Sequence, residues 1–112
     1  MRRKLALATT IGIALVLLVT SVAAGRGAKT VDVGNDFFDP VALEINKGTR
    51  VNFNWIGTDE HDVVKVRGPG PYFESGPTTG SGVQYTRRFK KAGRYKLICS
   101  LHEEMRMRLT VD

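Results

Sequence analysis

Apolar and polar residues alternate along much of residues 31–111, and this two-residue period limits the fold more than any other feature of the chain. A strand buried on one face has this period, because successive side chains point to opposite faces of a sheet. No convincing 3.6-residue period occurs outside the N-terminal apolar run. The alternating runs are short, are separated by turn residues, and begin at Val31, Val41, Val51, Val64, Val83, Tyr95 and Met107. The pattern predicts an all-β sandwich of about seven or eight strands.

Residues 67–82 form the one long connection in this pattern. They include five glycines and three prolines, which favour turns over strands. We expect this connection to be ordered at most around Tyr72 and Phe73.

Residues 1–24 have the pattern of a secretory signal peptide. Three basic residues at positions 2–4 precede an apolar run over residues 5–22, and small residues at 21–24 fit a cleavage site. An uncleaved membrane anchor is the alternative, because an apolar run of about 18 residues is near the lower limit for spanning a bilayer. Either way we expect export to the periplasm, the cell surface or the extracellular space.

The rest of the chain is long enough for a short linker over residues 25–30 and one small domain over residues 31–112. Without the basic residues at 2–4, 14 basic and 11 acidic residues remain, a net charge of +3. The excess lies in residues 87–96, with Arg106 and Arg108 nearby in sequence. Nucleic acid is a poor partner for such an exported domain. The charges predict a docking surface for an acidic partner or the solvated outer face of a strand.

Cys99 is the only cysteine of the chain, so it cannot form an internal disulfide. It lies in the run ICSLHEEM, which places His102 three residues later and Met105 six residues later. Strand parity puts Cys99 on the same face as Tyr95 and Leu97, so its sulfur is expected to point inward. His102 follows the end of the strand, where a turn can fold it back toward that sulfur.

The only other histidine, His61, completes a candidate copper site. Two imidazoles, a thiolate and a weak axial thioether suit copper that cycles between Cu(I) and Cu(II). Zinc would have only Glu103 and Glu104 as further ligands. A cysteine hydrolase would need an orienting third residue and an oxyanion helix, and neither is evident. The predicted metal ligands are His61, Cys99, His102 and Met105, and no catalytic residue is expected.

Two methionines compete for the axial position. Met107 shares a strand face with Leu109 and Val111, so packing in the core explains it. Met105 lies in the loop, where we expect no such packing role. Met105 is therefore the favoured axial ligand, and Met107 is the alternative.

The chain resembles the cupredoxins, specifically small blue copper proteins like plastocyanin, amicyanin and halocyanin. The resemblance covers residues 28–112 and is carried by FFDPVALEINKGTRVNFNW, HDVV and YFESG. It continues in YTRRFKKAGRYKLICSLHEEMRMRLTV, which is similar to the family ending F-x-x-x-G-x-Y-x-x-x-C-x-x-H-x-x-M. The resemblance implies a cupredoxin-like Greek-key sandwich and one type 1 copper ion, with His61, Cys99 and His102 as strong equatorial ligands.

The chain departs from the family pattern in two places. Leu101 stands where relatives have a proline before the second histidine. The loop WIGTDEH lacks the frequent asparagine, which leaves open what donates hydrogen bonds to the cysteine sulfur.

The resemblance also implies a function, namely one-electron transfer between redox proteins by a monomer that is not an enzyme. The partners expected include acidic and membrane-bound proteins, and the N-terminal segment is the only predicted membrane contact. We expect His61 to be the buried ligand, with an unidentified partner for its far ring nitrogen. His102 is expected at the exposed edge through which electrons pass. A copper-delivery module for an oxidase and a metal-free interaction domain are the alternatives.

Overall fold

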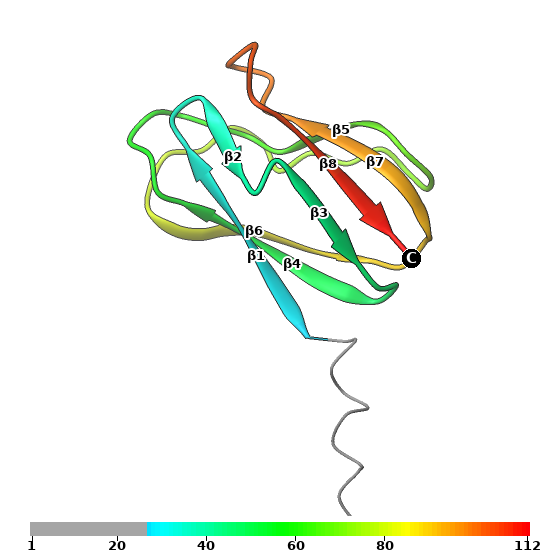
Figure 1. Cartoon of the computed structure of the whole chain (residues 1–112). Coiled ribbons are helices and arrows are strands. Elements are labelled where there is room, and N and C mark those ends of the chain that lie inside the picture. Colours follow the sequence, from blue (N-terminus) through cyan, green and yellow to red (C-terminus); the bar gives the residue numbers. More distant parts are fainter. Residues whose placement is uncertain (1–26) are drawn as a thin grey trace, which may run out of the picture.

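The computed structural model describes residues 27–112, so the predicted signal peptide lies outside the described residues. The described part forms eight strands and no helix (Figure 1). In chain order the strands are β1 (Ala28–Gly34), β2 (Phe37–Asp39), β3 (Ala42–Ile45), β4 (Thr49–Trp55), β5 (Val64–Arg67), β6 (Gly82–Phe89), β7 (Gly93–Ile98) and β8 (Arg106–Val111). Accordingly, residues 27–112 contain no helix that is long and apolar enough to cross a membrane.

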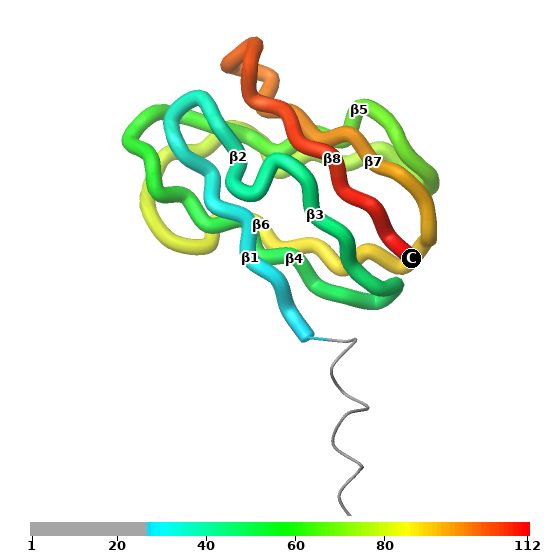
Figure 2. Tube along the Cα trace, in the orientation of Figure 1, coloured from blue at the N-terminus to red at the C-terminus, as the bar shows by residue number. Residues whose placement is uncertain are grey.

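The strands form two four-stranded sheets that pack against each other (Figure 2). One sheet has the order β2-β1-β4-β6 and the other has the order β3-β8-β7-β5. β1 runs parallel to β4 and β3 runs parallel to β8, whereas the other neighbours are antiparallel. The predicted all-β sandwich is confirmed.

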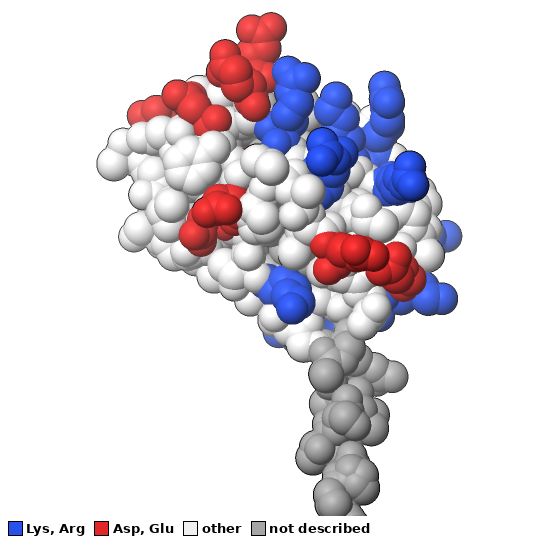
Figure 3. Space-filling model, in the orientation of Figure 1, with Lys and Arg blue, Asp and Glu red and all other residues white. Residues whose placement is uncertain are grey.

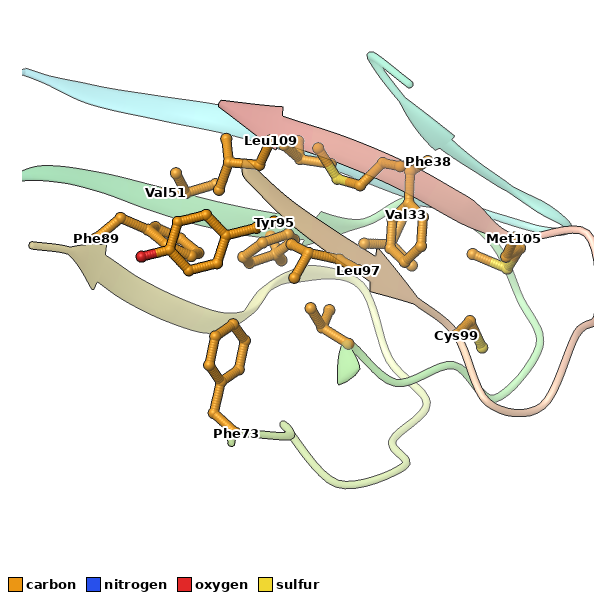
Figure 4. Close-up of a cluster of buried hydrophobic side chains, with 14 of the residues drawn as sticks. Val33, Phe38, Val51, Phe73, Phe89, Tyr95, Leu97, Cys99, Met105 and Leu109 are labelled. Atoms are coloured by element: carbon orange, nitrogen blue, oxygen red, sulfur yellow. The ribbon is translucent and has the colours of Figure 1, made fainter. Parts of the chain in front are cut away.

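The core lies between the two sheets and is built from alternate residues of the strands (Figure 4). On β7, Tyr95 and Leu97 are buried, and Cys99 continues their face just past the strand end. On β8 the buried residues are Met107, Leu109 and Val111. These two strands follow the predicted parity, and that parity carries the cysteine sulfur to the end of the core.

β1 begins at Ala28, three residues before the strand start that the alternation indicates. Residues 28–30 are exposed, so they contribute no buried apolar side chain to the pattern. They are strand because their backbone pairs in register with β4, beginning with Ala28 opposite Arg50. Backbone pairing of this kind leaves no mark on the hydrophobic period.

The predicted alternation fails at Val66 and Val83, which are 47% and 53% exposed. The register between β4 and β6 shifts between Phe53 and Asn54, so that Val83 lies opposite Asn54. A second shift interrupts the pairing of β5 with β7. Such bulges insert a residue into one strand and change which face the following side chains occupy.

The connection over residues 67–82 is more structured than its composition predicts. Phe73 is buried in the core, whereas Tyr72 is exposed. Beyond this aromatic pair, the backbone of Thr78 pairs with that of His61 through two hydrogen bonds of 3.0 and 2.9 Å. The connection therefore fixes the backbone of a predicted metal ligand.

Candidate metal centre

The predicted ligands meet at one end of the sandwich, where two loops lie together. His61 belongs to the loop between β4 and β5. Cys99, His102 and Met105 belong to the loop between β7 and β8. Because β5 and β7 are antiparallel neighbours, the chain enters β5 and leaves β7 at the same end of the sheet. The topology thus unites residues that are 38 positions apart.

Three ligand atoms surround one small space. The sulfur of Cys99 lies 3.9 Å from Nδ1 of His61 and 3.6 Å from Nδ1 of His102. The ligand atoms of the three residues all lie within 4.8 Å of one another. With metal–ligand bonds of about 2.0–2.3 Å, donors in a trigonal arrangement lie roughly 3.5–4.0 Å apart. The spacing fits a single metal ion between the two imidazoles and the thiolate.

Met105 is fully buried at the same end of the core as Cys99 (Figure 4). The N–H of Cys99 donates to the carbonyl of Met105, and the N–H of Met105 donates to the carbonyl of His102, both at 3.0 Å. The expectation that Met105 has no packing role is wrong, because it belongs to the hydrophobic core. Met107 is also buried, but it lies within β8 opposite Leu97. What distinguishes the two methionines is the place of Met105 in the ligand loop.

The far ring nitrogen of His61 has a partner that the sequence did not reveal. Nε2 of His61 lies 3.0 Å from Oδ1 of Asn35. The same oxygen accepts hydrogen bonds from the N–H groups of Thr58 and Asp59, at 3.1 and 3.0 Å. Asn35 therefore holds the imidazole against the loop between β4 and β5, to which His61 belongs, and Nδ1 of His61 faces Cys99.

Asn35 reaches His61 because of two features of the backbone. It lies in the two-residue turn that joins β1 to β2, and its neighbour Asp36 takes the left-handed conformation, with φ at 72°. The second feature is Gly57, whose backbone passes very close to the side chain of Asn35. Any Cβ atom at position 57 would clash with Oδ1 of Asn35. An Asn-Asp pair between two apolar runs is a turn signal, but nothing in the sequence links that turn to His61.

Asp62 supplies a hydrogen bond to the cysteine sulfur, whose donors the sequence left open. The N–H of Asp62 donates to Sγ of Cys99 at 3.5 Å. The buried carboxylate of Asp62 accepts from the N–H of Ser100 at 2.6 Å and from its hydroxyl at 2.5 Å. One residue thus joins the two ligand loops and holds the sulfur between them.

Burial favours the uncharged forms of two of the three donors. It raises the pKa of the Cys99 thiol, and the hydrogen bond from Asp62 opposes this shift. Burial, followed by the neighbouring His102, lowers the pKa of His61. A neutral imidazole keeps the lone pair that a metal needs, whereas the thiol must lose its proton when a metal binds.

His102 and the loop tips around it form the exposed end of the site. His102 is half-buried, and the preceding Leu101 is 45% exposed, which agrees with the predicted surface edge. The three loops at this end carry five exposed carboxylates, and residues 35–36, 56–61 and 99–105 include no lysine or arginine. These carboxylates belong to Asp36, Asp59, Glu60, Glu103 and Glu104. The surface around His102 is therefore acidic.

The sequence matches the family model of the cupredoxin-like domain over residues 7–111. The chain belongs to the cupredoxin-like family, and the fold and the donor set described above agree with this membership. The set His, Cys, His and Met is typical of a type 1 copper site, so copper is the cofactor that the family and the donors indicate.

Solved structures of cupredoxin proteins are similar to this chain. A purple cupredoxin from Nitrosopumilus maritimus is 25% identical, with a TM-score of 0.65 over 75% of this chain and 99% of that one. The reduced Cu(I) form of an amicyanin mutant at pH 4 is 23% identical, with a TM-score of 0.68 over 76% of this chain and 82% of that one. This second likeness shows the fold alone.

A copper-containing nitrite reductase from Thermus scotoductus SA-01 is 32% identical, with a TM-score of 0.67 over 76% of this chain. The match spans only 22% of the reductase. No protein of curated function matches the sequence significantly.

Proposed function

We propose that this protein carries single electrons outside the cytoplasm through one type 1 copper ion held by His61, Cys99, His102 and Met105. The observation that carries the proposal is the spacing of the cysteine sulfur from the two Nδ1 atoms, 3.6 and 3.9 Å, at the end of a cupredoxin sandwich. This spacing suits a trigonal metal with a weak fourth ligand.

Bound copper supplies the change between Cu(II) and Cu(I), and the chain's own residues hold its surroundings fixed. Hydrogen bonds to Asn35 and from Asp62 restrain His61 and the cysteine sulfur. Cys99, His61 and Met105 are buried, which excludes water from one side of the site. A site restrained in this way favours fast electron exchange, because few atoms must move when the charge changes. His102 offers the half-buried edge through which electrons would pass.

The proposed partners are redox proteins, including acidic or membrane-bound ones, and the protein acts as a monomer. Because the chain matches 22% of the nitrite reductase, electron transfer rather than nitrite reduction is proposed for it. Export depends on the N-terminal segment, which would be removed as a signal peptide or kept as an anchor.

The test is to add Cu(II) to the purified chain and to record its visible and EPR spectra. An intense blue or purple band with a type 1 EPR signal is expected, and Cys99→Ser should abolish both. A colourless protein with ordinary square-planar copper signals would contradict the proposal. Reversible voltammetry and slow release of copper to a chelator would separate an electron carrier from a copper-delivery module, which must give up its metal.

A further inference from the structure

Five basic side chains lie on the outer face of the β3-β8-β7-β5 sheet. The four on β7 and β8 alternate with the buried residues of these strands, so they point away from the core, and the fifth, on β5, is exposed beside them. Figure 3 shows a group of basic side chains over the region where Figure 1 draws these strands. We call this surface the basic face and define it by Arg67, Arg94, Lys96, Arg106 and Arg108.

The cations of the basic face lie directly beside one another. Arg67 of β5 is opposite Lys96 of β7, which in turn is opposite Arg108 of β8. Like charges on adjacent strands destabilise a sheet. No carboxylate of residues 27–112 forms an ion pair with these side chains, and Arg106 binds only the carbonyl of Glu103, at 3.0 Å. Their charge therefore remains available to an external partner.

The basic stretch of the sequence, residues 87–96, divides between two sheets. Arg87 lies on β6, and its guanidinium packs 4.0 Å from the ring centre of Phe73. Arg88 donates to the carbonyl of Gly48 at 2.6 Å. Both are held by contacts within the domain. Of this stretch, only the outward residues of β7 join the basic face.

The basic face is continuous with the metal centre. A shallow hollow of about 340 Å³ is lined by Lys96, Arg106, Glu103 and the ligand Cys99, together with Val66, Ile98 and Ser100. A partner seated on the cations would consequently lie beside the loop that holds the cysteine. For an electron carrier this is a useful position, because docking and electron exchange then occur on neighbouring surfaces.

We propose that the basic face is the docking surface for an acidic redox protein, a partner whose redox role depends on the function proposed above. Carboxylates border the cations on both sides. Glu104 shares a hollow with Arg106 and Arg108, and Glu44 lies opposite Thr110 in the neighbouring strand. A planar anionic membrane would meet these carboxylates together with the cations. A folded protein can place its acidic groups opposite the cations alone.

The test follows amide NMR shifts of the chain, in Cu(I)-loaded and copper-free form, as a short polyglutamate peptide is added at low and at physiological salt. Vesicles of equal parts phosphatidylcholine and phosphatidylglycerol form a second arm. The double variant Lys96→Glu with Arg108→Glu removes the centre of the basic face. The control, Lys90→Glu with Lys91→Glu, makes the same change of charge at exposed positions in the turn between β6 and β7.

Peptide-induced shifts should concentrate in β5, β7 and β8, and binding should weaken as the salt concentration rises. The affinity for the peptide should fall about tenfold in the first variant but less than about twofold in the control. Equal losses in both variants, shifts spread over all basic residues, or binding to vesicles without binding to the peptide would overturn the proposal. The Cu(II) spectrum of the same samples reports the copper site separately. A missing type 1 spectrum with intact docking would contradict the function and leave the docking surface standing.

Discussion

The imidazole of His61 is held at both of its nitrogens, with Oδ1 of Asn35 lying 3.0 Å from Nε2. An oxygen acceptor at this distance requires the proton on Nε2, so the lone pair is on Nδ1, which faces Cys99. Asn35 thereby selects the tautomer that can bind a metal before any metal arrives. This relationship joins the turn between β1 and β2 to the centre of the site.

Asn35→Ala should lower the affinity for copper by about 10- to 100-fold, because the ring loses the partner that fixes its tautomer and orientation. The measurement is competition with a chelator of known affinity. Asn54→Ala is the matched control, since the Asn54 side chain also makes a hydrogen bond, by donating to Asp32 at 3.1 Å, but lies on β4, outside the ligand loops. Equal copper affinities of the two variants would contradict this role for Asn35.

Asp62→Asn should raise the reduction potential of the copper site by about 60 mV or more, the one-electron equivalent of about 1.4 kcal/mol. The buried carboxylate favours the more highly charged Cu(II), and the amide removes that charge while it can still accept from Ser100. Voltammetry checks the shift. Ser100→Ala keeps the carboxylate and removes only its hydroxyl partner. A larger rise in Ser100→Ala than in Asp62→Asn would show that geometry, not charge, sets the potential.

Met105→Leu should shift the potential and the visible spectrum far more than Met107→Leu. Loss of an axial thioether alters the copper itself. A leucine at 107 replaces one apolar core side chain by another of similar volume, at a stability cost of less than about 1.5 kcal/mol. Voltammetry and chemical unfolding of both variants separate the two effects. The reverse order of spectral shifts would assign the axial position to Met107.

The strands that carry the ligand loop were predictable because each is buried on one face only. Tyr95, Leu97 and Cys99 follow one parity, and Met107 and Leu109 follow another on the next strand. That arrangement gives these strands a two-residue period of apolar residues in the sequence and places the side chain of Cys99 on the inward face. The loop between them is short, so Cys99, His102 and Met105 could be proposed as ligands of one site from their spacing together with their donor chemistry.

The surroundings of the ligands were not predictable in the same way. Asn35 and His61 are 26 residues apart and meet through a single side-chain hydrogen bond, which has no period. The sequence showed Asp62 only as the neighbour of His61. It did not indicate that the carboxylate of Asp62 links the two ligand loops. The exposure of Val83 depends on a bulge in its pairing with β4, where Tyr85 faces Phe53 and Val83 faces Asn54. Contacts of this kind depend on the tertiary fold and not on local sequence.

Lys65→Met should destabilise the domain by about 1–3 kcal/mol, although methionine is the more apolar residue. The ammonium of Lys65 is buried and donates to the carbonyls of Pro69, Gly70 and Pro71 at 2.6, 2.7 and 3.1 Å. Methionine has a similar length but no donor, so three carbonyls lose their partner. Urea unfolding measures the loss. The control is Lys47→Met at an exposed position, where a change within about 0.5 kcal/mol is expected. Equal stability of the two variants would show that water replaces the ammonium without cost.

Stability should fall as the pH rises above about 10, in part because of Tyr95. Burial raises the pKa of this phenol, and its hydroxyl donates to the carbonyl of Lys91 at 2.7 Å. The unfolded chain loses the phenol proton near the ordinary value, whereas the folded chain retains it to higher pH. Between the two pKa values the unfolded state binds fewer protons, so the free energy of unfolding decreases with pH, by at most about 1.4 kcal/mol per pH unit for this group.

Tyr95→Phe removes the ionisable group and keeps the ring that packs edge-on against Phe89, with centroids 5.2 Å apart. Its free energy of unfolding should therefore change less steeply than that of the unaltered chain above about pH 10. The measurement is urea unfolding of both proteins at a series of alkaline pH values. Tyr72 is present in both proteins and titrates alike in each, so the difference between the two curves belongs to Tyr95. Parallel curves would mean that the hydroxyl of Tyr95 titrates in the folded state as it does in the unfolded chain.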